Sequence, residues 1–475
     1  MMKNIKIRTI ALLVVSISLF SSCSKDFLEP KPTTALENDE VFKSLTNAKV
    51  AMIGAYDQFS SYYFDGLYLP IMSDLMGEDL MLNSERNYNW FVAVYQMQLL
   101  PNYQYSSNPW SKGYKILYDA NRIVEGANII PDASREEKEE LIAEAKVMRA
   151  FVMLKLVQMF APAYSVDANA PGILLVTTPL DYDAPDIKRS TVGDVYNQIV
   201  ADLSYAVDKL PAADYGETGF FGKRAAHAIL ARTYLDMQEW ANARDNAKLA
   251  YDGLELMSMQ ELVGGFYSSN SETIFSVSYT PEDNNVYLSI PSFYWPVAGY
   301  SSMRADVNFV NRFNKNDARS YQFQKIDQID PDNWLILKFQ HNQQVGNAER
   351  ISIRASEMYL IEAEAEAELN NYSVAQDALY KIQSRAYPGV QKPISTGQDL
   401  IDEILIERRK ELFGEGFRLN DIKRRNLAVK REGDHWVKFD YNPNDADYYR
   451  FTFPIPQKEI DANSALTQDD QNIGY

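Results

Sequence analysis

Apolar residues along much of this chain recur at alternating steps of three and four, which is the spacing of one face of a helix. Such a face runs from Trp110 to Val124, and Asn108 and Pro109 in front of it provide a helix start signal. A second helix is predicted over 135–160, where acidic residues gather toward the N-terminal half and the helix dipole favours them. These two helices are predicted to form a hairpin.

The same layout recurs further along the chain. Helical segments are predicted at 191–211, ending at Pro211, at 224–253, divided around 238–241, and at 354–386, with a turn at Asn370 and Asn371. Alanines fall where paired helices would pack closely, at Ala231, Ala243, Ala363 and Ala375. Paired helices with an alanine-rich seam resemble tetratricopeptide repeats, although long insertions interrupt the ~34-residue period of those repeats.

The predicted fold class is therefore mostly α, a degenerate tetratricopeptide-like scaffold of helical hairpins with long irregular loops and minor β-strands. The scaffold is assigned to about 30–60, 109–260 and 350–425. Between these parts, about 61–108 and 264–345 are rich in Gly, Pro, Asn and aromatic residues and lack a sustained helical period. Loops of this length usually carry function, so both are predicted to bind a ligand.

The single cysteine, Cys23, follows an uncharged apolar run over 10–20 with basic residues upstream. Eleven residues are too few to span a bilayer as a helix, for which roughly 20 are needed, so 1–22 is predicted to be a signal peptide. The small residues before Cys23 resemble a bacterial lipobox, which predicts a lipid anchor on that thiol. An ordinary secretory signal with an incidental thiol is the alternative.

Charge and composition limit the partners of the remaining chain. The formal net charge of the full chain is -18, and removal of residues 1–22 takes away three positive and no negative charges. Such an acidic surface repels phosphate backbones, which argues against nucleic-acid binding. No Gly/Ser linker or second long apolar segment interrupts the chain, so residues 23–475 are predicted to form a single domain. Attachment to a membrane would then depend on the lipid.

Five stretches of sequence carry a resemblance to a known family. They are the opening DFLEPKPTTALENDEVF with the helix NAKVAMIGAYD, the middle repeat GKRAAHAILARTYL, the later repeat RASEMYLIEAEAEAEL, the segment LIDEILIERRKELFGEGFRLNDIKR, and the ending FPIPQKEIDANSALTQDDQNIGY. Together they resemble the SusD/RagB family of Bacteroidetes nutrient-binding lipoproteins. The likeness covers nearly the whole mature chain and departs from the family mainly in the loops between repeats and in the tail segment NSALTQDDQN.

This resemblance implies a non-enzymatic binding protein, without a cofactor, lipid-anchored at the outer membrane and exposed on the cell surface. It implies a SusC-like TonB-dependent barrel transporter as partner and an oligosaccharide, or in some members a peptide, as cargo. The implied ligand site is a surface groove formed by the loops.

Motifs for other chemistry are weak. GETGFFGKR has the wrong glycine spacing for a phosphate-binding loop, and Arg224 stands where Ser or Thr would bind magnesium. DYNPNDADYY has Asp445 where a calcium loop needs glycine and Phe451 where it needs glutamate, so a solvated turn is predicted and no metal site. The charges of ERRKELFGEGFR recur at helical spacing, and Arg408 and Glu411 are predicted to hold the last helix against the scaffold.

The aromatic loops supply the site candidates. A sugar presents apolar C–H faces and a rim of hydroxyls, so its binder needs flat rings for stacking and polar groups for hydrogen bonds. Three sets in the loops offer both, Arg86, Tyr88, Asn89 and Trp90, then Tyr294, Trp295 and Tyr300 with Arg304, then Trp334 with Asn333. Trp110 and Trp240 lie on helical faces and are predicted to belong to the core.

Three other functions stay open. In a peptide-binding member of the same family, the acidic residues Asp74, Glu78 and Asp79 would meet cationic peptides. An extracellular glycoside hydrolase would need a pair of carboxylates, which 65 acidic residues make impossible to select from sequence. A pure repeat scaffold for protein assembly would leave the aromatic loops without a purpose.

Overall fold

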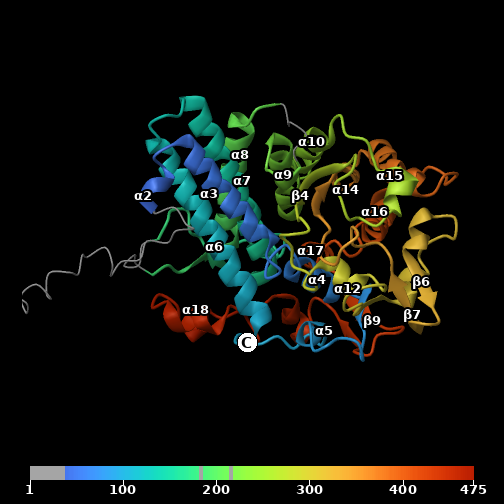
Figure 1. The fold of residues 1–475 in the computed structure, drawn as a ribbon. Coiled ribbons are helices and arrows are strands. Elements are labelled where there is room, and N and C mark those ends of the chain that lie inside the picture. Colours follow the sequence, from blue (N-terminus) through green and yellow to red (C-terminus); the bar gives the residue numbers. More distant parts are fainter. Residues whose placement is uncertain (1–37, 181–185, 213–217) are drawn as a thin grey trace, which may run out of the picture.

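Helices form about half of the protein in the computed structural model, which describes residues 38–180, 186–212 and 218–475 (Figure 1). Cys23 and the predicted signal peptide lie outside the described residues, so the lipid anchor stays a prediction. The longer helices are α3 (Leu45–Ser60), α6 (Gln104–Gly126), α7 (Arg135–Phe160), α8 (Val192–Lys209), α9 (Lys223–Met237), α10 (Trp240–Tyr251), α14 (Ala355–Glu368), α15 (Tyr372–Ala386) and α16 (Gly397–Glu411). The mostly α fold class is thereby confirmed.

The helical hairpins fall where the sequence predicts them. Helix α7 begins with a capping box in which the Ser134 hydroxyl accepts a hydrogen bond from the Glu137 amide and the Glu137 carboxylate accepts one from the Ser134 amide. Helix α6 begins four residues before Asn108, so the predicted start was wrong and Pro109 lies inside the helix. The early turn buries Tyr105 and Ser106, and this burial outweighs the hydrogen bond that Pro109 cannot donate.

The helices pack in an order that follows the chain except at one point. Each helix from α6 to α9 packs against its successor, and α10 then packs against α14, although about a hundred residues separate α10 from α14 in sequence. Strand β4 (Thr273–Val277) and strand β8 (Arg350–Arg354) pair antiparallel and close this long insertion at its base. The insertion, which includes most of the predicted loop 264–345, is therefore held between two neighbouring helices of the scaffold.

Within residues 38–180, 186–212 and 218–475, four small antiparallel sheets accompany the helices, which confirms the predicted minor strands. The largest has the order β1-β5-β7-β6 and joins the two predicted ligand loops, because β1 (Leu80–Leu82) comes from the first and β5 (Met303–Ala305), β6 (Phe323–Ile326) and β7 (Asp330–Ile336) come from the second. The other strands are β2 (Pro171–Leu174), β3 (Arg189–Thr191), β9 (Val429–Arg431) and β10 (Phe439–Tyr441).

Short helices fill the loops and the C-terminal segment. They are α2 (Asn38–Val41), α4 (Tyr68–Leu75), α5 (Val92–Tyr95), η2 (Ala127–Ile129), α11 (Met259–Leu262), α12 (Ile290–Tyr294), α13 (Val307–Val310), η3 (Ala318–Gln322), α17 (Arg418–Arg424), η4 (Ala446–Phe451), α18 (Gln457–Ala462) and η5 (Gln468–Asp470). Both tryptophans assigned to helical faces lie against the core, with Trp110 buried and Trp240 partly buried.

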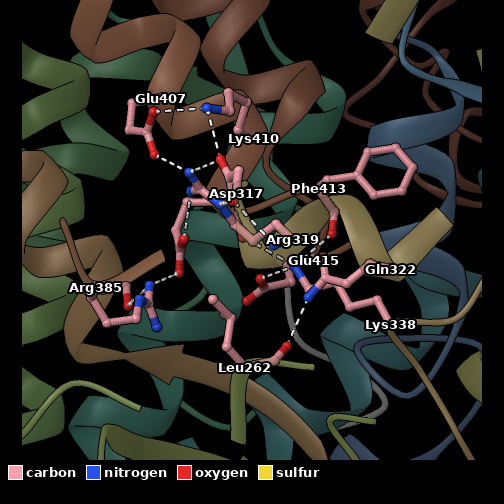
Figure 2. Close-up of polar contacts among 12 residues, drawn as sticks. Leu262, Asp317, Arg319, Gln322, Lys338, Arg385, Glu407, Lys410, Phe413 and Glu415 are labelled. Carbon is pink, nitrogen blue, oxygen red and sulfur yellow. Dashed lines mark hydrogen bonds and ion pairs between the residues drawn. The ribbon is translucent and has the colours of Figure 1, made fainter. Parts of the chain in front are cut away.

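A buried ionic network fixes the insertion to the C-terminal helices (Figure 2). Glu411 accepts hydrogen bonds from three arginines, namely Arg319 at 2.9 Å, Arg354 at 2.8 Å and Arg385 at 2.5 Å. In Figure 2, Arg319 lies between Asp317 and Glu407, and Lys410 bridges the same two carboxylates.

The second carboxylate at the centre of this network is Glu415, which pairs with Lys338 at 2.6 Å and with Arg354 at 2.7 Å. Arg408 pairs with Asp421 of α17 at 2.9 Å. The predicted architectural role of Arg408 and Glu411 is confirmed, since both are buried and paired with residues of other elements. The network places the strands of the insertion, and hence the aromatic loops, at a fixed position on the scaffold.

Candidate functional site

The loop between β1 and α5 is held in one conformation by its own asparagines. The Asn83 side chain accepts hydrogen bonds from the amides of Glu85 and Arg86, and the Asn87 amide group donates to the carbonyls of Asn83 and Ser84. Asn87 Oδ1 then accepts from the Asn89 amide, and the Asn87 carbonyl accepts from the Trp90 amide. These bonds hold the rings of this loop in fixed positions before any ligand arrives.

Left-handed backbone conformations determine where the rings of this loop point. Tyr88, Asn89 and Phe91 have φ of 52°, 62° and 58°, which is uncommon for residues other than glycine and costs conformational energy. Tyr88 is 59% exposed, whereas Phe91 is fully buried and anchors the loop. Strain of this kind is concentrated at functional sites in proteins.

The facing segment carries Tyr300 after the short helix α12. The amide of Ser301 donates to the Ser292 carbonyl, and that of Ser302 to the Phe293 carbonyl, so the chain folds back on the helix. Gly299 permits this close turn with φ of +88°, since a Cβ there would lie 2.3 Å from Ser292 Oγ.

Three partly or largely exposed rings surround that of Tyr300, and we call Tyr88, Trp90, Tyr287 and Tyr300 the Tyr300 cluster. The ring centroid of Tyr300 lies 5.3 Å from that of Tyr88, 6.4 Å from that of Trp90 and 6.2 Å from that of Tyr287. Beneath them Phe293, which is fully buried, contacts Tyr300 at 4.9 Å and Trp90 edge-on at 6.0 Å. The fold thus brings together rings from the two loops that the sequence singled out.

Three of the aromatic candidates lie elsewhere. Tyr294 is 0% exposed and packs against Phe339 at 5.0 Å, so the prediction that it contacts a ligand was wrong. Its side chain follows that of Phe293 into the core at the end of α12, where burial of both rings stabilises the turn. Trp295 and Trp334 are partly buried, and neither makes a ring contact with the Tyr300 cluster within the described part of the chain. Both stay predictions.

Polar groups accompany the rings. The side chains of Arg86 and Asn89 are exposed and have no hydrogen-bond partner among residues 38–180, 186–212 and 218–475. Asp330 accepts from Asn83 at 3.1 Å and from the buried Arg304 at 2.8 Å, which ties the first loop to the sheet. Burial would raise the pKa of Asp330, but its bonds from Asn333 and Arg304 outweigh this and lower it.

Sequence reasoning missed two members of this arrangement. Tyr287 is 53% exposed at the edge of the cluster, and Phe293 supports it from below. Both occur in the aromatic-rich loop that was selected, so composition indicated the region, but only the folded chain shows which rings share a surface.

The acidic residues considered for cationic peptides serve the scaffold. Asp74 accepts from the amides of Gly416 and Arg418, Glu78 pairs with Arg418 at 2.5 Å, and Asp79 pairs with Arg409. All three lie against the C-terminal segment, because their partners are located at the end of α16, at the start of α17 and between these helices. Such buried pairs hold the two helices against the rest of the fold. Their assignment as peptide contacts was therefore wrong.

Within the described ranges, no three His, Cys, Asp or Glu side chains are grouped so that they could hold a metal ion. The same part of the chain has no helix that combines the length and the apolar character needed to cross a membrane.

Family models match the chain over almost its whole length. The model described as SusD family matches residues 236–475, and one described as starch-binding associating with outer membrane matches residues 26–235. The chain belongs to the SusD family. The resemblance stated from the sequence is thereby confirmed.

Curated SusD-like proteins are similar over long alignments. SusD-like protein P2 of Formosa agariphila is 24% identical over 100% of both chains. A SusD-like protein of Bacteroides ovatus is 25% identical over 64% of this chain and 58% of its own.

Solved structures share the fold. A SusD superfamily protein from Bacteroides thetaiotaomicron superimposes with a TM-score of 0.82 at 26% identity, covering 90% of this chain and 99% of that one. A structure described as a laminarin-binding SusD-like protein has a TM-score of 0.74 at 20% identity, covering 91% and 100%, and at that identity it shows the fold alone.

Proposed function

We propose that this SusD-family protein captures oligosaccharides on the Tyr300 cluster, at the cell surface, and delivers them without turnover to a SusC-like TonB-dependent outer-membrane transporter. The single observation that carries the proposal is the meeting of Tyr88, Trp90, Tyr287 and Tyr300 on one surface, built from two loops more than 190 residues apart. Membership of the family, and the laminarin-binding name of a structural relative, support it.

The chemistry of the cluster suits a neutral, hydroxyl-rich ligand. Exposed rings stack on the apolar face of a pyranose, and this contact depends little on ionic strength. Arg86 and Asn89 would supply hydrogen bonds to the hydroxyl rim. The strained loop is formed before binding, which lowers the entropy cost of capture.

The anchor and the transporter complete the proposal. Acyl chains on Cys23 would hold the protein at the outer membrane, since each buried methylene adds about 0.8 kcal/mol. A capture protein held beside its transporter raises the local ligand concentration at the entrance.

Isothermal titration of residues 24–475 against plant, host and microbial oligosaccharides tests the capture step. We expect saturable heat with one glycan and a loss of about 1–3 kcal/mol of binding free energy in Trp90→Ala, since removal of a stacked ring costs this much at an exposed site. Trp240→Ala is the matched control, because Trp240 packs against the core away from the cluster. Release of cleavage products from the glycan would identify the protein as a hydrolase. Binding of peptides without binding of any glycan would show that the ligand is a peptide.

A further inference from the structure

A separate cavity of about 540 Å³ opens between helices α3, α7 and α9 and strand β4, which meet in the upper half of the molecule (Figure 1). None of its lining residues belongs to the Tyr300 cluster. The volume falls within the roughly 300–1,000 Å³ typical of small-molecule sites. The structure therefore offers a second place for a ligand, independent of the proposed sugar site.

The floor of this cavity is apolar. Met52, Leu141 and Ile274 are buried in it, and Phe220 in its wall is 41% exposed. Phe220 stands edge-on to Tyr56, with centroids 5.1 Å apart, so its position is fixed by the core. A ligand with an apolar body would gain free energy here by covering these side chains.

One carboxylate inside the cavity is positioned by the core. The Tyr56 hydroxyl donates to Glu144 Oε1 at 2.7 Å and accepts from the Phe221 amide at 2.7 Å. The other oxygen of Glu144 has no hydrogen-bond or ion-pair partner among the described residues. Burial raises the pKa of Glu144 to about 7, with smaller opposing effects of the Tyr56 hydrogen bond and the charge of Lys49. A cation that entered the cavity would find an acceptor there.

The charges at the mouth favour the same sign of ligand. Glu137 and Glu140 are exposed on the face of α7 that carries Glu144. Two cationic side chains also line the cavity, but the guanidinium of Arg224 donates to the carbonyls of Ala250 and Asp252. These bonds leave the positive charge of Arg224 in place, so Lys49 and Arg224 stand opposite three carboxylates, which outnumber the cations by one among the described lining residues.

We propose that this cavity is a binding site for organic cations with an apolar body, in which the ligand's ammonium or guanidinium group pairs with Glu144 and its apolar part covers Phe220 and the floor. Both a free aromatic amine and a short peptide with a basic side chain have this chemistry. Carboxylates beside an aromatic wall recognise such cations by charge and by cation–π contact.

Titration with three probes tests the proposal. Phenethylamine represents the free amine, phenylalanyl-arginine amide represents the peptide, and 2-phenylethanol is the neutral analogue of the first. We expect saturable binding of at least one cation, about tenfold tighter than that of the alcohol. Binding of the peptide alone would assign the site to peptides, and binding of the amine would extend it to free amines. Absence of cation binding, or equal affinity for amine and alcohol, overturns the proposal.

Two substitutions separate charge from packing. Glu144→Gln is expected to remove the preference for the cation over the alcohol, whereas Lys49→Gln, at an exposed position, is expected to tighten cation binding about threefold by removing a like charge. Glu136→Gln is the matched control, because Glu136 is exposed on the same helix but does not line the cavity. A cation affinity unchanged in both Glu144→Gln and Lys49→Gln would refute the pairing.

The site can be distinguished experimentally from the sugar site. Trp90→Ala is expected to leave binding of the cationic probe unchanged, and Glu144→Gln is expected to leave oligosaccharide binding unchanged. Loss of cation binding in Trp90→Ala would show that the probe occupies the Tyr300 cluster, and would overturn the second site while leaving the sugar proposal in place.

Discussion

Replacement of Glu411 by glutamine tests whether the buried network holds the insertion in place. The carboxylate is 1% exposed and pairs with three arginines. Its removal leaves Arg385 without a carboxylate partner among the described residues and takes one of several carboxylates from each of Arg319 and Arg354. Burial alone would raise the pKa of Glu411, but the guanidinium groups of Arg385, Arg354 and Arg319 outweigh burial and hold that pKa well below its usual range. The site therefore favours the ionised form that the substitution removes.

The expected loss of stability is the difference between two large effects, the attraction within the ion pairs and the cost of desolvating the ions. Each pair is worth about 4 kcal/mol at 4 Å and an effective dielectric constant of about 20, and desolvation costs several kcal/mol for each ion. When one partner of a buried pair is removed, the measured net loss is about 3–5 kcal/mol, which we expect for Glu411→Gln. Such a loss is a large part of the ~5–15 kcal/mol by which domains are usually stable.

Urea unfolding, followed by tryptophan fluorescence and by far-ultraviolet circular dichroism, measures this loss of stability. The loss appears as a lower urea concentration at the unfolding midpoint, while the dependence of the free energy of unfolding on urea stays the same. Glu432→Gln is the control, because Glu432 and its partner Lys430 are both exposed and the pair is screened by solvent. We expect no measurable change in the control. A loss below about 1 kcal/mol in Glu411→Gln would refute the idea that these charges depend on one another.

Three further predictions concern other parts of the chain. Burial, helped by the charge of Arg431, lowers the pKa of His435 to about 4, so the stability it contributes is present above its unfolded pKa of about 6.5 and is lost as pH falls toward 4. The free energy of unfolding should therefore fall between pH 7 and 4.5 by about 2–3 kcal/mol more in the wild type than in His435→Gln, and equal slopes would contradict this. Gly299→Ala should lower the free energy of unfolding in urea by more than about 1 kcal/mol and weaken glycan binding, because the alanine Cβ would clash with Ser292. An unchanged glycan affinity would show that this turn does not shape the binding site. Cys23→Ala should fold normally but leave the membrane fraction after a high-salt wash, and retention there would contradict the anchor.

The sequence predicts a feature correctly where neighbouring residues determine it, and fails where contacts between distant residues do. The capping box at Ser134 and Glu137 and the periodic apolar face of α8 need only neighbouring residues, so their helices begin and end close to the predicted positions. The start of α6 was misplaced because burial of Tyr105, a tertiary effect, overrides the local signal of Pro109. The assignment of Asp74 failed for the same reason, since its partner amide at Arg418 lies more than 340 residues away.

The sequence by itself determined the helical scaffold, the family and the regions of chain that carry aromatic rings, because periodicity, capping and composition act over short distances. Only the tertiary structure decided which rings share a surface. Tyr294 and Tyr300 are equally plausible in sequence, yet the turn of α12 buries the first ring and places the second against Tyr88 and Trp90 from the other loop. Pairing of β1 with β5 sets that juxtaposition, and a strand pairing over more than 200 residues is decided by the packing of the whole chain.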